Sequence, residues 1–369
     1  MAFKISFASP TTIAPSTFGA FKIDSLQILR AVAALSVFFF HFFDAMNNDF
    51  GLFSGNVFSV GAFGVDVFFV VSGFIICFAA EKETSPISFF IKRLCRILPL
   101  YYLLTFGVFL IAIVAPFLLN STSADIPNLL KSLFFIPYAK ENGLVQPLLF
   151  LGWTLNYEMF FYVIFAISMI AGRFKIYVCI AIISLLILAG YVTKPTSTIA
   201  QFYTSGIMLN FIWGAVSYLI FRHFPNVCKA LQPFWPLAAI AILAQNFVQL
   251  PLNREFAFGL PAAMLLLGVV TIKVPNGKVW SFSQLLGDAS YSLYLVHPYI
   301  LQVIIKVLIP LVGINIVSIS TATVMSIAVT FLASILLFKW IEKPSNTFLR
   351  SIALKKTMRA GGLSVKLSS

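Results

Sequence analysis

Long apolar stretches, separated by short polar segments, make up most of this chain. A helix needs about 20 mostly apolar residues to cross a hydrocarbon core of roughly 30 Å. The segment 129–137 is too short to cross and is predicted to be interfacial or re-entrant. The pattern predicts ten transmembrane helices, at residues 26–45, 57–79, 98–119, 148–170, 175–192, 203–221, 233–250, 256–272, 290–311 and 317–340.

Composition supports a membrane protein. Hydrophobic residues make up 60% of the chain and charged residues only 10%, with a mean hydropathy of +0.97. A soluble domain carries about 25% charged residues, and a water-soluble fold of this length has no room to bury so much apolar surface. We therefore expect an all-α, polytopic membrane helix bundle.

The basic residues indicate which side of the membrane each loop occupies. With ten spans, 20 of the 25 Lys and Arg residues fall on one side, which the positive-inside rule makes the cytoplasmic side. Both termini are then cytoplasmic. The net charge of +13 is explained by this topology and does not indicate a nucleic-acid partner.

The polar ends divide the chain into three parts. Residues 1–22 are rich in Ser, Thr and Pro and are predicted to form a disordered cytoplasmic leader. Residues 23–342 form the membrane domain, and residues 343–369 form a basic cytoplasmic tail. Chemistry must therefore come from the membrane bundle itself.

Ionisable residues at membrane depth are costly and usually mark a functional site. The first predicted span contains Arg30 and His41. Eleven positions at 100° each place both side chains on one helix face, roughly 16 Å apart along the axis. Two simpler interpretations remain open: Arg30 is an anchor at the membrane rim, or His41 forms an interhelical hydrogen bond.

Two carboxylates are predicted at a depth similar to that of His41. Asp66 lies in the second span and Glu158 in the fourth, and both spans run inward. A histidine with a carboxylate in a low-dielectric site suits general-base chemistry, because the carboxylate orients the ring and stabilises its cation. Alternatively, Asp66 caps a helix N-terminus, or Glu158 forms a structural ion pair.

Arg93 and Arg96 lie at the predicted cytoplasmic end of the third span and, three residues apart, share a helix face. Two guanidinium groups offer bidentate binding to phosphates. The alternative is anchoring to lipid headgroups. His297, in the ninth span, is interpreted either as a packing residue or as a ligand.

Taken in order, these motifs resemble the membrane acyltransferase-3 family. They are Arg30-x10-His41, Gly64-Val65-Asp66 through Ser72-Gly73-Phe74, Arg93-x-x-Arg96, Trp153 to Glu158, and Ser290 to His297. Residues 154–162 are similar to the branch that acetylates bacterial exopolysaccharides. The resemblance covers residues 24–342.

The resemblance implies an integral membrane O-acyltransferase of the bacterial plasma (inner) membrane. Such an enzyme moves an acyl group, usually acetyl, from cytoplasmic acyl-coenzyme A to a hydroxyl of an exported or surface polysaccharide or its lipid-linked precursor. His41 is then expected to be the catalytic base, with Arg30, Asp66 and Glu158 in the same site. Arg93 and Arg96 are expected to bind the coenzyme phosphates, and no metal is expected.

Two other classes are weighed against this prediction. A proton-coupled transporter or flippase of polysaccharide precursors also uses buried histidines and carboxylates, but it predicts inverted repeats that are not visible in the chain. A structural subunit of an export complex has no need for four buried ionisable residues. Besides the sugar acceptor, the expected partners are membrane lipids.

Overall fold

The protein is described by a computed structural model that covers residues 23–51, 57–119, 122–248, 251–313 and 315–360. The predicted leader, residues 1–22, and the last part of the predicted tail, residues 361–369, lie outside the described residues. Within the described part, the chain forms helices joined by short connections, and its only β-type pairing is one isolated bridge between Ala139 and Val145.

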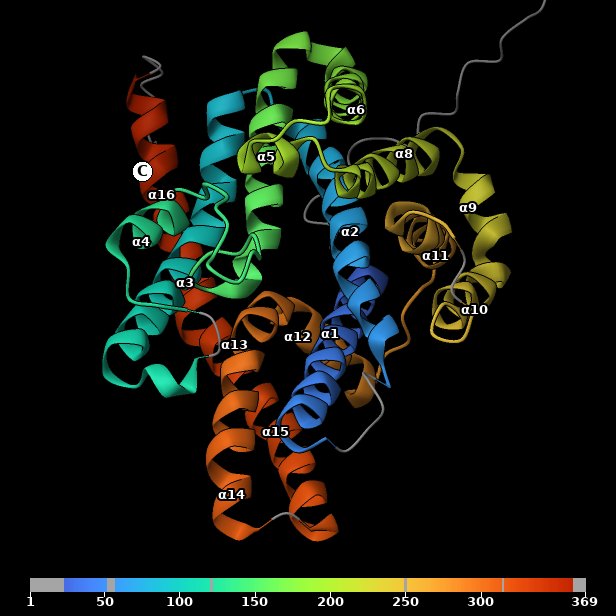
Figure 1. The fold of residues 1–369 in the computed structure, drawn as a ribbon. Coiled ribbons are helices and arrows are strands. Elements are labelled where there is room, and N and C mark those ends of the chain that lie inside the picture. Colours follow the sequence, from blue (N-terminus) through green and yellow to red (C-terminus); the bar gives the residue numbers. More distant parts are fainter. Residues whose placement is uncertain (1–22, 52–56, 120–121, 249–250, 314, 361–369) are drawn as a thin grey trace, which may run out of the picture.

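Sixteen α-helices follow one another along the chain (Figure 1). They are α1 (Asp24–Phe50), α2 (Phe63–Ala79), α3 (Pro86–Val114), α4 (Ile126–Leu133), α5 (Trp153–Ser168), α6 (Lys175–Thr193), α7 (Thr198–Tyr203), α8 (Leu209–His223), α9 (Pro225–Leu231), α10 (Trp235–Ala244), α11 (Leu260–Val269), α12 (Lys278–Asp288), α13 (Ser290–Val303), α14 (Ile309–Val312), α15 (Ile316–Leu337) and α16 (Lys343–Ala360).

Eight described helical segments are long and apolar enough to cross a membrane. One of them, Phe150–Thr193, covers the predicted spans 148–170 and 175–192 and bends at Gly172, which has a φ of 56°. A shorter apolar helix, Glu255–Val269, covers the predicted span 256–272. Each of the ten predicted spans therefore falls on an apolar helix, which confirms the polytopic helical bundle. The cytoplasmic location of the termini stays a prediction.

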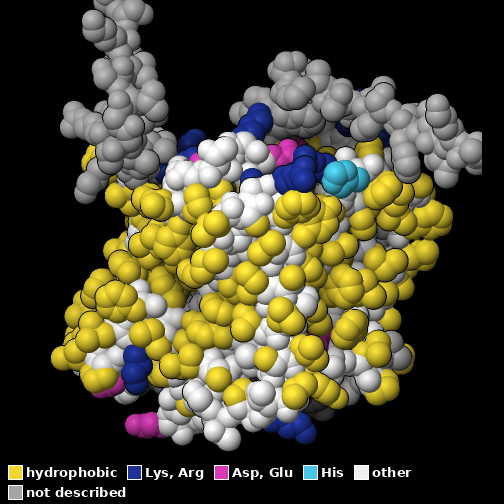
Figure 2. All heavy atoms as spheres, turned by 90° about the horizontal axis from the view of Figure 1, so that it is seen from above, with side chains coloured by type: hydrophobic (Ala, Val, Ile, Leu, Met, Phe, Trp, Pro, Cys, Tyr) yellow, Lys and Arg dark blue, Asp and Glu magenta, His cyan; other side chains and the backbone are white. Residues whose placement is uncertain are grey.

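The outer surface agrees with a lipid environment. In Figure 2, hydrophobic side chains cover a broad middle band, and the charged side chains lie near the upper and lower borders of that view. Such a band is expected where a protein faces hydrocarbon, because unpaired charges are costly there.

Close contact between α2 and α8 builds the centre of the bundle. A Cβ on Gly73 would lie 2.3 Å from the Phe211 carbonyl oxygen, and one on Gly214 would lie 2.1 Å from the Val70 carbonyl oxygen. Only glycine permits this approach. Small residues at helix contacts are the expected solution in membranes, where van der Waals packing holds helices together.

The connection between α3 and α5 contains the segment that was predicted to be interfacial or re-entrant. It forms the short helix α4, followed by an irregular stretch in which Phe135 has a φ of 57°. Hydrogen bonds from the Tyr101 hydroxyl to the Ser132 carbonyl (2.9 Å) and from the Tyr102 hydroxyl to the Leu133 carbonyl (3.0 Å) tie α4 to α3.

The last helical segment continues past the predicted end of the tenth span. A π-helical turn, Phe338–Glu342, joins α15 to α16 without a break, and α16 packs against α3. The described part of the predicted basic tail is therefore a helix in contact with the bundle.

Candidate active site

A cavity lies inside the bundle. Five helices, α1, α2, α3, α5 and α13, line it, so segments far apart in the sequence meet there. Its polar lining residues are Arg30, Ser72, Arg93, Arg96, Thr154, Glu158, Tyr162, Ser290, Tyr291 and Tyr294. A cavity on which several polar groups converge is the usual candidate for a ligand site.

Three of the predicted residues bring positive charge to this cavity. Arg30 is 8% exposed and donates a hydrogen bond from Nη1 to Gln27 Oε1 at 2.9 Å. Arg93 lies over the Phe89 ring, with its Cζ 5.4 Å from the ring centroid. The Nε of Arg93 is buried without a hydrogen-bond partner among the described residues. The arginines thus retain unused capacity to bind an anion.

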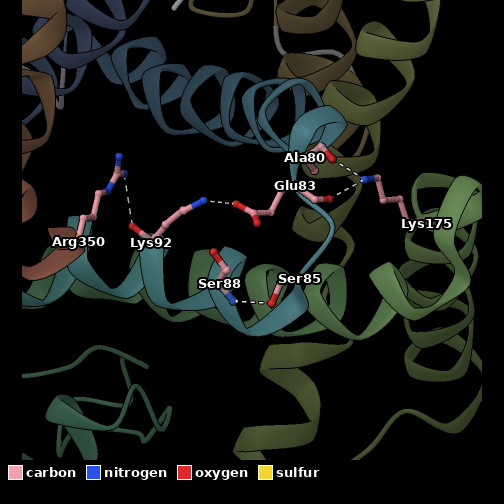
Figure 3. Close-up of polar contacts among 7 residues, drawn as sticks. All are labelled: Ala80, Glu83, Ser85, Ser88, Lys92, Lys175 and Arg350. Atoms are coloured by element: carbon pink, nitrogen blue, oxygen red, sulfur yellow. Dashed lines mark hydrogen bonds and ion pairs between the residues drawn. The ribbon is translucent and has the colours of Figure 1, made fainter. Parts of the chain in front are cut away.

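The start of α3, which carries Arg93 and Arg96, is held from several directions (Figure 3). Ser85 caps the helix by accepting a hydrogen bond from the Ser88 amide at 3.2 Å. Lys92 forms an ion pair with Glu83, and Lys175 of α6 donates to the Ala80 and Glu83 carbonyls. These contacts fix the direction in which α3 presents its arginines.

Glu158 supplies negative charge to the cavity. Its Oε1 accepts hydrogen bonds from the Ser72 hydroxyl at 2.9 Å and from the Tyr162 hydroxyl one turn later on α5. It is close enough to Arg93 and Arg96 for their charges to interact. The hydrogen bonds of Glu158 in the described structure are to Ser72 and Tyr162, so the simpler interpretation from the sequence, a structural ion pair with a basic side chain, stays a prediction.

His41 lies outside the set of cavity-lining residues and is paired with another histidine. The His41 ring centroid is 5.4 Å from that of His297 and 5.5 Å from that of Phe150. Within the described part of the chain, neither Asp66 nor Glu158 forms a hydrogen bond or ion pair with His41. The structure therefore places a second imidazole, and not a carboxylate, beside the predicted base.

His297 connects this pair to the cavity. It is fully buried, its Nδ1 is 3.1 Å from the Leu293 carbonyl oxygen, and its Nε2 has no partner among the described residues. An Nδ1–H that donates to Leu293 leaves Nε2 as a free acceptor. Tyr294 lines the cavity one turn before His297, and their ring centroids are 6.2 Å apart. The histidine pair thus lies next to the cavity.

Asp66 faces a different part of the bundle. Its carboxylate forms an ion pair with Arg254 Nη2 at 2.8 Å and accepts a hydrogen bond from Asn210 Nδ2 at 2.8 Å. Arg254 Nη2 also donates to the Ala62 carbonyl at 2.9 Å. Asp66 is absent from the lining of the cavity that Arg30, Arg93, Arg96 and Glu158 share. This geometry favours a role in joining α2 to the segment that precedes α11.

Glu342 is a buried acid that is not among the residues predicted from the sequence. It is 7% exposed, its Oε2 accepts a hydrogen bond from Ser292 at 2.6 Å, and its charge acts on Arg30 and Arg96. The hydropathy pattern placed it just beyond the last span. The signal that marks it is the π-helical turn Phe338–Glu342, because such turns frequently occur at functional sites.

Comparison with known proteins gives these residues a family context. A family model described as an acyltransferase domain, Acyl_transf_3, matches residues 23–338. The chain is 34% identical over 261 residues to the "Exopolysaccharide production protein ExoZ" of Rhizobium meliloti (strain 1021), covering 69% of this chain and 80% of that protein. No solved structure matches it significantly.

Two further relatives are named as acyltransferases. The "Acyltransferase MdmB" of Streptomyces mycarofaciens is 25% identical, covering 75% of this chain and 78% of its own length. The "Peptidoglycan O-acetyltransferase OatA" of Listeria monocytogenes is 24% identical, covering 87% of this chain and 55% of its own length. Since the family model spans nearly the whole described bundle, this chain belongs to the acyltransferase-3 family and is a multi-pass membrane acyltransferase.

Proposed function

We propose that this enzyme transfers an acetyl group from cytoplasmic acyl-coenzyme A to a hydroxyl of an exported or surface polysaccharide, or of its lipid-linked precursor, in the bacterial plasma membrane. Support for the acceptor class comes from the relatives, one named for exopolysaccharide production and one for peptidoglycan O-acetylation. Support for the donor comes from the cavity.

The observation that carries this proposal is the convergence of Arg30, Arg93 and Arg96 on one cavity that is also lined by Tyr294, whose ring centroid is 6.2 Å from that of His297 in the histidine pair. Guanidinium groups bind phosphates bidentately, and coenzyme A is rich in phosphates at one end and carries its thioester at the other. The arginines therefore suit the nucleotide end of the donor, and the thioester is directed toward Tyr294 and His297.

In the proposed reaction, His41 accepts the proton of the sugar hydroxyl as its oxygen attacks the thioester carbonyl carbon. The new carbon–oxygen ester bond forms, the carbon–sulfur bond breaks, and the coenzyme leaves as a thiolate. The imidazolium then returns its proton to that sulfur. His297, 5.4 Å away between ring centroids, helps to orient His41, in the way that a neighbouring group holds a catalytic imidazole.

The test uses membranes that contain the enzyme, acetyl-CoA with a labelled acetyl group, and the polysaccharide fraction of the same cells. We expect the wild type to label the polymer and His41→Ala to lose this activity. Replacing both Arg93 and Arg96 with Gln should raise the KM for acetyl-CoA. Arg173→Gln, which removes an exposed arginine, is the matched control. Normal labelling by His41→Ala would refute the proposed base.

A further inference from the structure

A fourth arginine approaches the predicted donor site from the C-terminal helix. Arg350 of α16 donates a hydrogen bond from Nη2 to the backbone carbonyl of Lys92 on α3 at 3.5 Å (Figure 3). It therefore reaches the segment of α3 that carries Arg93 and Arg96. The packing of α16 against α3 brings these residues together although they are more than 250 positions apart.

The hydrogen-bonding capacity of this arginine is not satisfied by the protein. Its Nε is buried without a partner in the described part of the chain, and the same is true of the Arg93 Nε. An unpaired buried donor costs roughly 1–3 kcal/mol, and more when the group is charged. Two guanidinium groups whose charges act on each other, each with a buried Nε that lacks a described partner, indicate that a group from outside the protein completes the site.

The charged groups near Arg350 also leave its positive charge uncompensated. Arg350 is within electrostatic range of Arg93 and Arg96, which are positively charged like itself. No described carboxylate forms an ion pair or hydrogen bond with it. Lys92, by contrast, is already neutralised by Glu83 (Figure 3).

The other arginines of the cluster are each acted on by an acid. Glu158 acts on Arg30, Arg93 and Arg96, and Glu342 acts on Arg30 and Arg96. Among the described groups, no carboxylate acts on Arg350. A phosphate group would supply both the negative charge and the hydrogen-bond acceptors that Arg350 lacks, because it is anionic and has several strong acceptor oxygens.

We propose that Arg350 is a phosphate-binding residue and that it forms, with Arg93 and Arg96, an anion site between α3 and α16 that binds the phosphates of the acyl donor. This inference rests on the proposed function, since it identifies the part of the donor that the site recognises. It also assigns a binding role to the predicted basic tail.

The test compares two donors in Arg350→Gln. One is acetyl-CoA, and the other is S-acetyl-N-acetylcysteamine, a thioester without nucleotide or phosphates. Loss of a charged hydrogen bond predicts a KM for acetyl-CoA that is about 10- to 100-fold higher, with the phosphate-free donor unaffected. The KM of Arg350→Lys for acetyl-CoA should lie between those of the wild type and Arg350→Gln, because lysine keeps the charge and loses the planar guanidinium group. Lys343→Gln, which removes an exposed charge from the same helix, is the matched control.

The phosphate-free donor also reports on folding, since a misfolded variant would lose activity with both donors. An unchanged KM for acetyl-CoA, or an equal rise in KM for both donors in a variant that keeps the wild-type unfolding midpoint, would overturn the inference. A lipid headgroup is the other source of phosphate at this depth. Nanodiscs of phosphatidylglycerol and of digalactosyldiacylglycerol, a lipid without phosphate, separate the sources: a variant effect that disappears in the phosphate-free lipid would assign the site to lipid and refute donor binding.

Direct binding of free CoA to the purified protein keeps this inference separate from the proposed function. If the wild type transfers no acetyl group but binds CoA with an affinity that depends on Arg350, the proposed function fails and the phosphate site stands. If acetyl transfer occurs with a KM that is independent of Arg350, the proposed function stands and the phosphate site fails.

Discussion

The rings of His41 and His297 lie with their centroids 5.4 Å apart, although α1 and α13 stand near opposite ends of the chain. His297 keeps one nitrogen without a partner in the described structure, and it lies one turn from Tyr294 of the cavity. Two imidazoles next to a cavity lined by arginines form the chemical centre of the proposed mechanism.

The histidine pair predicts non-additive losses of activity. General-base catalysis contributes about 10²- to 10⁴-fold, so His41→Ala should lower kcat by that factor. His297→Ala should cause a smaller loss, because it acts through His41. Adding it to His41→Ala should then change little, since residues that act as a unit are not additive. The kcat values of the single and double variants are measured at saturating acetyl-CoA. A loss in the double variant equal to the product of the two single losses would contradict the pairing.

The ion pair between Asp66 and Arg254 predicts a loss of stability. Asp66 is fully buried, whereas the Arg254 side chain is 38% exposed, so losing the pair should cost about 1–3 kcal/mol, less than for a fully buried pair. Asp66→Asn should therefore reduce the amount of folded enzyme in the membrane and lower its thermal unfolding midpoint. Quantitative blotting measures the amount of folded enzyme, and kcat per folded molecule measures catalysis, so together they separate a structural role of Asp66 from a catalytic one. A normal unfolding midpoint with kcat lost would instead favour the sequence-based prediction that Asp66 acts in catalysis.

The contact between α2 and α8 predicts opposite effects at two glycines. A methyl group on Gly214 meets the Val70 carbonyl and the Phe74 amide nitrogen, so Gly214→Ala should destabilise the protein by about 1–3 kcal/mol or more. Gly107 on α3 has no heavy atom within 4 Å of such a methyl group. Gly107→Ala should be neutral or stabilise by about 0.5–1 kcal/mol. Thermal unfolding in one detergent compares the pair, and equal destabilisation would contradict the packing.

The burial of Lys140, in the connection between α4 and α5, predicts how the stability of the protein depends on pH. Burial lowers the pKa of Lys140 to about 8, and its Nζ donates to Thr122 Oγ1 at 3.0 Å. The unfolded chain, with a lysine pKa of about 10.4, binds more protons between the two values. Stability should therefore rise with pH from about 8 toward 10. Lys140→Met should flatten this rise in the unfolding midpoint.

The same lysine reports on topology. An impermeant amine reagent should label Lys140 in intact cells, with a midpoint near pH 8, because its loop is predicted to lie outside. In SDS-unfolded protein the midpoint should move up toward about 10.4. Mass spectrometry identifies the labelled peptide. Protection of Lys140 in intact cells combined with labelling in inverted vesicles would reverse the predicted orientation.

Hydropathy was sufficient to find the helices, because each membrane span must satisfy its own backbone and shows a long apolar stretch. The helical periodicity additionally predicts Arg30 and His41 on one helix face. What it did not reveal was which helices meet. The pairing of Asp66 with Arg254, of His41 with His297, and of Glu342 with Ser292 depends on lateral contacts between distant segments. A single sequence carries no local signal for such contacts.

The unbroken helical stretch Val317–Ile352 has 36 residues, and at 1.5 Å per residue it is about 54 Å long. A hydrocarbon layer of roughly 30 Å is too thin to contain it. Part of the stretch therefore lies beyond the hydrocarbon layer, and Arg350 is near the C-terminal end of the stretch. Under the proposed function, a water-soluble nucleotide would first meet the enzyme at this end of the helix, and its thioester end would enter the bundle.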